Sequence, residues 1–225
     1  MDYGADNYAG VTFSNAGARR IFIGWMSNWQ YANVVPTQSW RSATTIPRDL
    51  QLVDVNGQAY LTSQPVKELE QITRSEIKMD DVDVNGNLDL SKQLTSFGGK
   101  YLLNLELDSL QDISLHLSNA KGDEVVVGYD KTSNMYYTDR TRSGQIDFEQ
   151  TFARKTIGPR ISPNKRMSLK LLVDVASVKV FADAGLSVLT NIFFPAEPLQ
   201  FLNIRTKAPL KIKEITYSSV NTTLK

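Results

Sequence analysis

The sequence predicts an all-β protein, and three observations support that fold class. Apolar and polar residues alternate strictly in segments such as 103–107 and 113–117, which is the pattern of strands with one buried and one solvated face. Turn-forming residues interrupt such segments at short intervals. Only residues 65–72 have the spacing of a helix. Many short strands with almost no helix are typical of β-sandwiches, barrels and propeller blades.

The expected elements follow one another along the chain. A first strand is expected at 20–24, and Pro65 has the fixed φ that suits the first turn of the helical segment. Later strands are expected at 103–107, 113–117, 169–171, 178–180 and 210–212. Turns are expected at 55–57, 84–86, 121–123 and 183–185. The Lys213-Glu214 step breaks the last alternation and predicts a β-bulge.

Charge and composition exclude several classes of protein. The chain has 25 basic and 24 acidic side chains, so its net charge of +1 provides no attraction to nucleic acid or to an anionic membrane. The absence of cysteine excludes disulfides, iron–sulfur clusters and Cys-ligated zinc. The acidic N-terminus lacks the regions of a signal peptide, and no apolar run approaches the roughly 20 residues that span a bilayer. Neutral ligands such as sugars fit best, and we expect no nucleic-acid or membrane partner.

Aromatic residues divide the chain into two parts. All three tryptophans, Trp25, Trp29 and Trp40, lie within the first 40 residues. After Ile72 aromatic residues become fewer and the alternation becomes plainer. We therefore place a boundary in the segment from about 58 to 73.

The segment 24–31 combines the two kinds of group that bind sugars. Trp25 and Trp29 have flat apolar faces that stack on sugar rings, and polar neighbours such as Asn28 can bond hydroxyl groups. Trp25 directly follows the expected first strand, where it can face a cleft. The alternative is that these aromatic residues only fill a small β core, and composition alone favours that alternative.

Three other motifs have simpler explanations than metal binding or catalysis. Residues 80–92 begin like an EF-hand calcium loop, but Lys92 occupies the position of the bidentate glutamate, so a tight hairpin turn is favoured. His116, the only histidine, alternates with serines on the polar face of a strand, so a solvated surface role is favoured over a catalytic triad. Asp139 stands beside arginines, and an Asp–Arg pair that holds a loop is favoured over a glycosidase carboxylate. We expect no metal and no cofactor.

A longer set of motifs is more specific. In the first 48 residues it comprises Asp2–Ala9, Gly24–Ala32, Pro36-Thr37, Trp40–Ala43 and Ile46–Arg48. Further along the chain it comprises Gln64–Leu69, Asp139–Gly144, Asp174–Phe181 and Ile192–Pro195. In order and composition this set resembles the C-terminal portion of glycoside hydrolase family 32, most closely its exo-inulinases and levanases.

The resemblance implies a fold with defined boundaries. The family joins a five-bladed β-propeller to a C-terminal antiparallel β-sandwich. By this resemblance we expect the last propeller blade at 1–57, a linker at 58–73 and the sandwich at 74–225. Two positions depart from the family. Asn7 replaces a usual aromatic residue, and Lys179 replaces a frequent glutamate where it is expected to touch only the sandwich surface.

The catalytic motifs that the resemblance would require are absent from this sequence. The family cleaves β-fructosides with retention through an Asp nucleophile in a Trp-Met-Asn-Asp-Pro-Asn-Gly motif and a Glu acid/base in a Glu-Cys motif. A further Asp belongs to an Arg-Asp-Pro motif, which Arg48-Asp49 does not match because Leu50 follows. All three motifs lie earlier in such proteins. We therefore expect no catalytic residue here and no activity of this chain alone.

The resemblance also implies substrate-binding residues and partners. Tyr8 and Trp25 match positions that approach the fructosyl subsite, Asp6 lies beside them, and Asn28 and Trp29 are expected at the cleft rim. The expected function is that of the C-terminal region of a retaining fructan β-fructosidase, whose extracellular or periplasmic parent hydrolyses levan, inulin or sucrose. The missing propeller blades are expected partners, and their absence predicts self-association. The alternatives are a carbohydrate-binding module and a structural or dimerisation sandwich.

Overall fold

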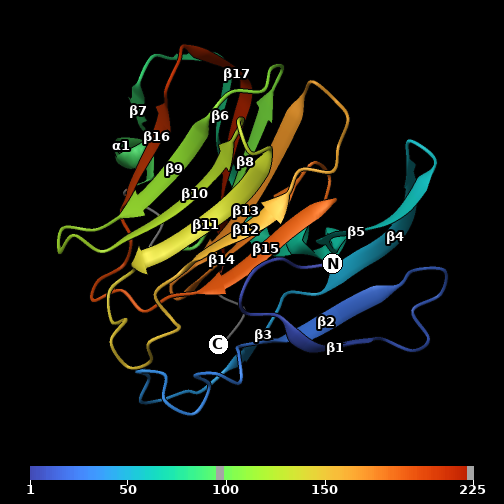
Figure 1. Ribbon diagram of the computed structural model, residues 1–225, viewed down its shortest axis with the longest axis vertical. Helices are drawn as coiled ribbons and strands as arrows, with labels where there is room; N and C mark the ends of the chain where they lie inside the picture. Colours follow the sequence, from blue (N-terminus) through green and yellow to red (C-terminus); the bar gives the residue numbers. More distant parts are fainter. Residues whose placement is uncertain (95–98, 222–225) are drawn as a thin grey trace.

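The computed structural model describes residues 1–94 and 99–221, and its regular secondary structure is almost entirely antiparallel strands in three sheets (Figure 1). Residues 95–98 and 222–225, which fall in the range expected for the sandwich, lie outside the described residues. The N-terminal strands form one sheet, and the other two sheets face each other as a sandwich. The all-β fold class is confirmed. Among the described residues, no helix is both long and apolar enough to cross a membrane.

The first sheet has the strand order β1-β2-β4-β5, with β3 paired to β2. Its strands are β1 (Tyr8–Thr12), β2 (Ile21–Met26), β3 (Ala43–Thr44), β4 (Arg48–Val55) and β5 (Gln58–Pro65). A short 3₁₀ helix, η1 (Lys67–Ile72), leads from this sheet into the sandwich.

The sandwich contains two six-stranded sheets. One has the order β15-β14-β13-β8-β17-β6 and the other the order β12-β11-β10-β9-β16-β7. The strands of the one sheet are β6 (Thr73–Val84), β8 (Tyr101–Leu107), β13 (Met167–Asp174), β14 (Ser177–Ala182), β15 (Ser187–Ile192) and β17 (Leu210–Val220). Those of the other are β7 (Asn87–Asp89), β9 (Ile113–Ser118), β10 (Glu124–Asp130), β11 (Met135–Arg142), β12 (Lys155–Pro159) and β16 (Phe201–Thr206). The short helix α1 (Ser91–Leu94) follows β7.

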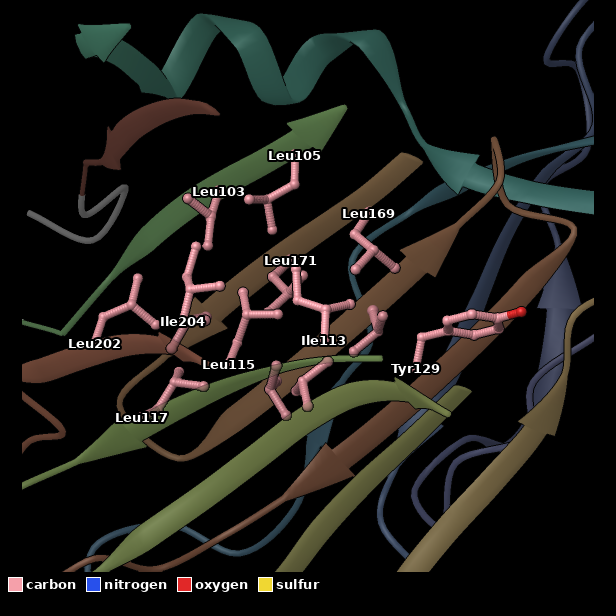
Figure 2. Packing of buried hydrophobic residues seen from close by; sticks show 14 of the residues in the cluster. Leu103, Leu105, Ile113, Leu115, Leu117, Tyr129, Leu169, Leu171, Leu202 and Ile204 are labelled. Atoms are coloured by element: carbon pink, nitrogen blue, oxygen red, sulfur yellow. The ribbon is translucent and has the colours of Figure 1, made fainter. Parts of the chain in front are cut away.

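The core of the sandwich is the apolar layer between its two sheets (Figure 2). In β8 and β9, which belong to opposite sheets, every second residue is buried, including Leu103, Leu105, Leu115 and Leu117. The residues between them point away from the core, as the pleat of a strand requires. Each fully buried leucine contributes about 1.5–3 kcal/mol, so this layer is the main source of hydrophobic stabilisation.

Most local predictions agree with the observed elements. All five expected strands of the second part lie within β8, β9, β13, β14 and β17. The turn at 55–57 joins β4 to β5, with Asn56 and Gly57 at positive φ. The predicted bulge is present, because the register between β17 and β8 shifts between Ile212 and Glu214. Within the expected helical segment 65–72, residues Lys67–Ile72 form the 3₁₀ helix η1, whereas Pro65 ends β5 and is not in the first turn.

Two expectations about chain connections are corrected. The turn at 84–86 does not close a hairpin, because β6 lies in one sandwich sheet and β7 in the other, so the chain crosses between sheets there. Residues 58–65, expected in the linker, form β5 and pair with β4 along its length. They therefore belong to the first sheet, and the connecting segment is limited to 66–72.

The first sheet is fixed to the sandwich through buried polar contacts. The guanidinium of Arg48, which is fully buried, donates to Asp2 Oδ2 at 2.8 Å and to Thr190 Oγ1 at 2.7 Å. The same guanidinium lies 5.3 Å from the ring centre of Phe181. As a result β14 and β15 are buried on both faces, whereas alternation in β14 predicts one solvated face.

Lys179 lies in this contact, which corrects the expectation that it touches only the sandwich surface. It is 3% exposed, and its Nζ donates to Ser177 Oγ at 2.6 Å. Together with Leu69 of η1 and with Ile46, in the loop between β3 and β4 of the N-terminal part (the first unit), Lys179 lines a cavity of about 260 Å³. Burial lowers the pKa of Lys179 to about 8, against the opposing effect of the Asp174 charge.

Replacing Lys179 with methionine is expected to change how stability depends on pH. Below pH 8 the folded protein holds the Lys179 ammonium buried, and the desolvation of this charge destabilises the fold. Between about pH 8 and 10.5 the folded protein has released this proton while the unfolded chain still binds it, so the destabilisation is progressively removed. The free energy of unfolding of the wild type, relative to that of Lys179→Met, should therefore rise by on the order of 3 kcal/mol across this window. Urea denaturation at several pH values measures the difference. Lys165→Met, at an exposed position, is the control, and a difference that stays flat for Lys179→Met would contradict the burial of its charge.

Candidate functional site

An exposed row of three aromatic side chains lies on the first sheet and the loop after β2. Tyr8 of β1 and Trp25 of β2 are partners in register, with ring centres 6.2 Å apart and an edge-to-face arrangement. Trp29 follows in the loop, with its ring centre 5.0 Å from that of Trp25. Tyr8 is 54% exposed and Trp29 66% exposed, while Trp25 is partly buried. We call these three residues the aromatic row.

The period of β2 explains why Trp25 belongs to this surface. Burial alternates along the strand, with Phe22 and Met26 buried, so Trp25 lies on the opposite, less buried face. Trp25 stands one residue before the end of β2, close to the expected strand end. Aromatic residues that only filled a small core would be buried, and Tyr8 and Trp29 are not.

Asn28 shapes the loop that presents Trp29. Its side-chain Oδ1 accepts a hydrogen bond from Gln30 N at 2.9 Å, and its Nδ2 donates to Ala5 O at 2.9 Å. The first bond closes a tight turn around Trp29, and the second ties the loop to the N-terminal segment. The Asn28 amide is thus engaged with the protein backbone on both sides.

Asp6 occupies a different environment from the aromatic row. Its side chain is fully buried, and its Oδ2 accepts hydrogen bonds from Arg140 Nη1 at 2.7 Å and from Ile192 N at 2.9 Å. The Tyr31 hydroxyl donates to its other oxygen. Burial raises the pKa of Asp6, and the Arg140 charge and these hydrogen bonds oppose that rise. The carboxylate therefore joins the first unit to the sandwich and presents no oxygen at the surface.

Arg140 is the partner that sequence reasoning missed. Its guanidinium is fully buried, donates to Phe152 O at 2.8 Å and to Tyr31 Oη at 3.0 Å, and lies 4.0 Å from the ring centre of Phe152. The Asp139-Arg140 motif indicated an Asp–Arg pair, but the pairing is corrected. Asp139 Oδ1 accepts hydrogen bonds from its neighbour Thr141, whereas Arg140 binds Asp6, which is 134 residues away.

His116 is less solvated than the sequence predicts. Its side chain is 15% exposed, with Nδ1 2.9 Å from Glu124 Oε1 and Nε2 3.0 Å from Ser114 Oγ. It does lie on the face of β9 that points away from the core, as its alternation predicts.

Acidic side chains do not gather into a metal site in the part of the chain that the structure describes, where no group of three or more potential ligands is found. In the EF-hand-like segment, Asp81 pairs with Lys211 at 3.1 Å.

The aromatic row has the chemistry of a sugar-binding surface. Exposed aromatic rings stack on the apolar faces of sugar rings, and the row places such rings side by side. Asp6, the carboxylate expected beside them, is committed to Arg140, so the row can bind but receives no acid or nucleophile from Asp6. Fold and site together define a two-unit all-β protein, in which a small sheet with a surface suited to sugar rings is fixed to a β-sandwich.

Comparisons with known proteins identify the family. The model of the glycosyl hydrolases family 32 N-terminal domain matches residues 1–65, and that of the glycosyl hydrolases family 32 C terminal matches residues 68–219. The chain belongs to glycoside hydrolase family 32. The first sheet is a blade of the family's β-propeller, and the two six-stranded sheets form its C-terminal β-sandwich.

Individual relatives agree with this assignment. A levanase of Bacillus subtilis (strain 168) is 34% identical over 96% of this chain and 33% of its own length. The extracellular exo-inulinase of Aspergillus ficuum is 32% identical over 87% of this chain and 38% of its own length. The crystal structure of the exo-inulinase from Aspergillus awamori has a TM-score of 0.83 and 27% identity, and the match covers 100% of this chain and 45% of that one. The chain thus spans between a third and two fifths of the length of these curated relatives.

Proposed function

We propose that this chain is the C-terminal region of a retaining fructan β-fructosidase and that the aromatic row forms part of its fructan-binding surface. The observation that carries the proposal is the aromatic row, with Tyr8 and Trp29 exposed and Trp25 partly buried between them in ring contact with both, in a family member whose relatives are named levanase and exo-inulinase. In this proposal Tyr8 and Trp25 approach the fructosyl unit and Trp29 stacks at the rim. Asn28 holds the loop that carries Trp29, and Asp6 fixes the N-terminal segment to the sandwich through its bond to Arg140.

We propose further that this chain does not hydrolyse fructans by itself. The catalytic carboxylate motifs of the family are absent from the sequence, and a missing nucleophile and acid/base cost many orders of magnitude in rate. Other propeller blades would supply them in the whole protein, for which levan, inulin and sucrose are the proposed substrates. Export of the whole protein is proposed because its relatives include an extracellular exo-inulinase.

Binding and activity measurements test this proposal. In calorimetric titrations with levan and inulin oligosaccharides, Trp25→Ala and Trp29→Ala are each expected to weaken binding about tenfold. Trp40→Ala removes a tryptophan of similar exposure outside the row and should leave the affinity unchanged. Incubation of the chain with sucrose, inulin or levan should release no fructose above a buffer blank.

Other outcomes would redirect the assignment. Undiminished binding by the two row variants would contradict the role of the aromatic row and favour a sandwich that binds polysaccharide alone. Fructose release that rises with protein concentration would contradict the proposed inactivity.

A structural role of the sandwich is a second candidate, favoured by the buried contacts of Arg48 with Thr190 and of Arg140 with Asp6, which join the first sheet and its N-terminal segment to the sandwich. Apolar side chains of the first sheet remain exposed, among them Val11, Phe13 and Leu52. Such a surface is suited to contact with neighbouring blades. In their absence the same surface is proposed to drive self-association.

A further inference from the structure

Three side chains on the outward face of a sandwich sheet form a hydrogen-bonded chain. Ser114 and His116 lie two residues apart on β9, and Glu124 begins β10, which pairs with β9. Ser114 Oγ lies 3.0 Å from His116 Nε2, and His116 Nδ1 lies 2.9 Å from Glu124 Oε1. We call these three residues the Ser–His–Glu chain.

The proton positions in this chain follow from its carboxylate end. Burial of Glu124 opposes its ionisation, but the hydrogen bond from His116 and the charge and hydrogen bond of Arg142 lower its pKa below the ordinary value. The ionised carboxylate only accepts, so it takes the Nδ1–H of His116. In the neutral ring, Nε2 is then the acceptor that faces the Ser114 hydroxyl. Nucleophile, base and orienting carboxylate stand in the order that activates a serine.

A hollow of about 150 Å³ opens beside Ser114, and its polar lining combines Tyr137, Arg205 and Lys207 with the carboxylates of Asp112 and Asp130. Gly128 is the register partner of Ser114 on β10 and leaves room for the Tyr137 side chain, since a Cβ at position 128 would lie 2.5 Å from the Tyr137 hydroxyl. Arg205 is the register partner of Ser114 on the other side, from β16. The Tyr137 hydroxyl and the Arg205 guanidinium thus share the hollow with Ser114 and are the lining groups suited to stabilise a developing negative charge.

We propose that the Ser–His–Glu chain is a hydrolytic site for short-chain acyl esters of alcohols, with the hollow limiting the size of the acyl group. Ser114 Oγ attacks the ester carbonyl carbon while His116 Nε2 takes the hydroxyl proton. Tyr137 and Arg205 stabilise the resulting oxyanion. The ester C–O bond then breaks, and the alcohol leaves with the proton from His116. Water attacks the acyl-serine with His116 as base, which releases the carboxylic acid and restores the serine.

This site is independent of the proposed fructan binding. The Ser–His–Glu chain lies on the sandwich, whereas the aromatic row lies on the first sheet. The reaction consumes only water and needs no further reactant. A hydrogen-bonded chain with a purely structural role would have the same resting geometry but would form no covalent acyl-serine, so covalent labelling separates the two.

Hydrolysis of p-nitrophenyl acetate by the full chain tests the proposal. We expect protein-dependent release of p-nitrophenolate above the buffer rate, with a loss of at least about tenfold in Ser114→Ala and in His116→Gln. Glu124→Gln should lose part of the activity. Intact-mass spectrometry after treatment with a fluorophosphonate should show one adduct, and peptide mapping should place it on Ser114.

Ser118→Ala is the matched control, because Ser118 lies on the same face of β9 and should leave rate and labelling unchanged. Circular dichroism and the melting temperature show whether each variant is folded. Activity that survives Ser114→Ala but not His116→Gln would overturn the proposal, since imidazole alone would then be the nucleophile. A wild-type rate equal to buffer, with no adduct on Ser114, would overturn it as well.

Discussion

Replacing Asp6 with asparagine is expected to lower the free energy of unfolding by about 3–5 kcal/mol, because it leaves a fully buried arginine without its counter-charge. Arg140 keeps its bonds to Phe152 O and Tyr31, but no other carboxylate reaches its guanidinium in the described ion pairs. The melting temperature should fall by on the order of 10 °C. Urea denaturation followed by circular dichroism measures the change.

Two further variants sharpen this result. Asp147→Asn changes an exposed aspartate and should shift stability by less than about 0.5 kcal/mol. The double variant Asp6→Asn with Arg140→Met removes both charges and should regain much of the loss, since the largest cost lies in one unpaired charge. An effect of Asp6→Asn as small as that of Asp147→Asn would mean that Asp6 is already protonated when the protein is folded.

Replacing Gly185 with alanine is expected to destabilise the contact between the two units by about 2–5 kcal/mol. Gly185 has a φ of +79°, which costs other residues about 1–2 kcal/mol. An added Cβ would also lie 2.3 Å from Ser63 O of β5, so backbone must move and the overpacking adds about 1–3 kcal/mol. The displacement would strain the hydrogen bond from Ser63 N to Gly185 O, which is 3.0 Å long.

Gly57→Ala separates the two contributions. Gly57 has nearly the same φ, +81°, but a Cβ there would meet no atom within 4 Å. It should therefore show only the cost of the backbone conformation, and thermal unfolding of both variants measures the difference. Equal losses of stability in the two variants would mean that the backbone contact between β5 and the β14–β15 turn can move to accommodate the Cβ without a free-energy cost.

Several strands, several turns and one irregularity could be predicted from the sequence. Alternation in 103–107 and 113–117 depends only on the pleat, which turns successive side chains to opposite faces. Asn56 and Gly57 tolerate positive φ, so their turn is also a local property. The break in alternation at Lys213-Glu214 predicts the bulge, because an extra residue in a strand interrupts the alternation of its side chains. Residue type raised Trp25 and Trp29 as candidates, the family resemblance added Tyr8, and the assignment of these residues to fructan binding stays a proposal.

Contacts between distant segments could not be predicted in this way. The turn at 84–86 has hairpin residues, yet it crosses between sheets because β7 pairs with β16 rather than with β6. Lys179 has the alternation of a solvated residue, yet the first unit covers its face. Such outcomes depend on which surfaces dock, and that is decided by the whole chain.

The sequence by itself determined the all-β class, the positions of several strands and the family of this protein, because hydrophobic period, turn chemistry and motif order depend on residues that are close together in the sequence. Only the tertiary structure decided that Asp6 pairs with Arg140 and that Asp139 does not. The same holds for the joining of Ser114, His116 and Glu124 into one hydrogen-bonded chain across β9 and β10. The physical reason is that a charge or a hydroxyl finds its partner by proximity in space, and strand register and sheet docking set that proximity.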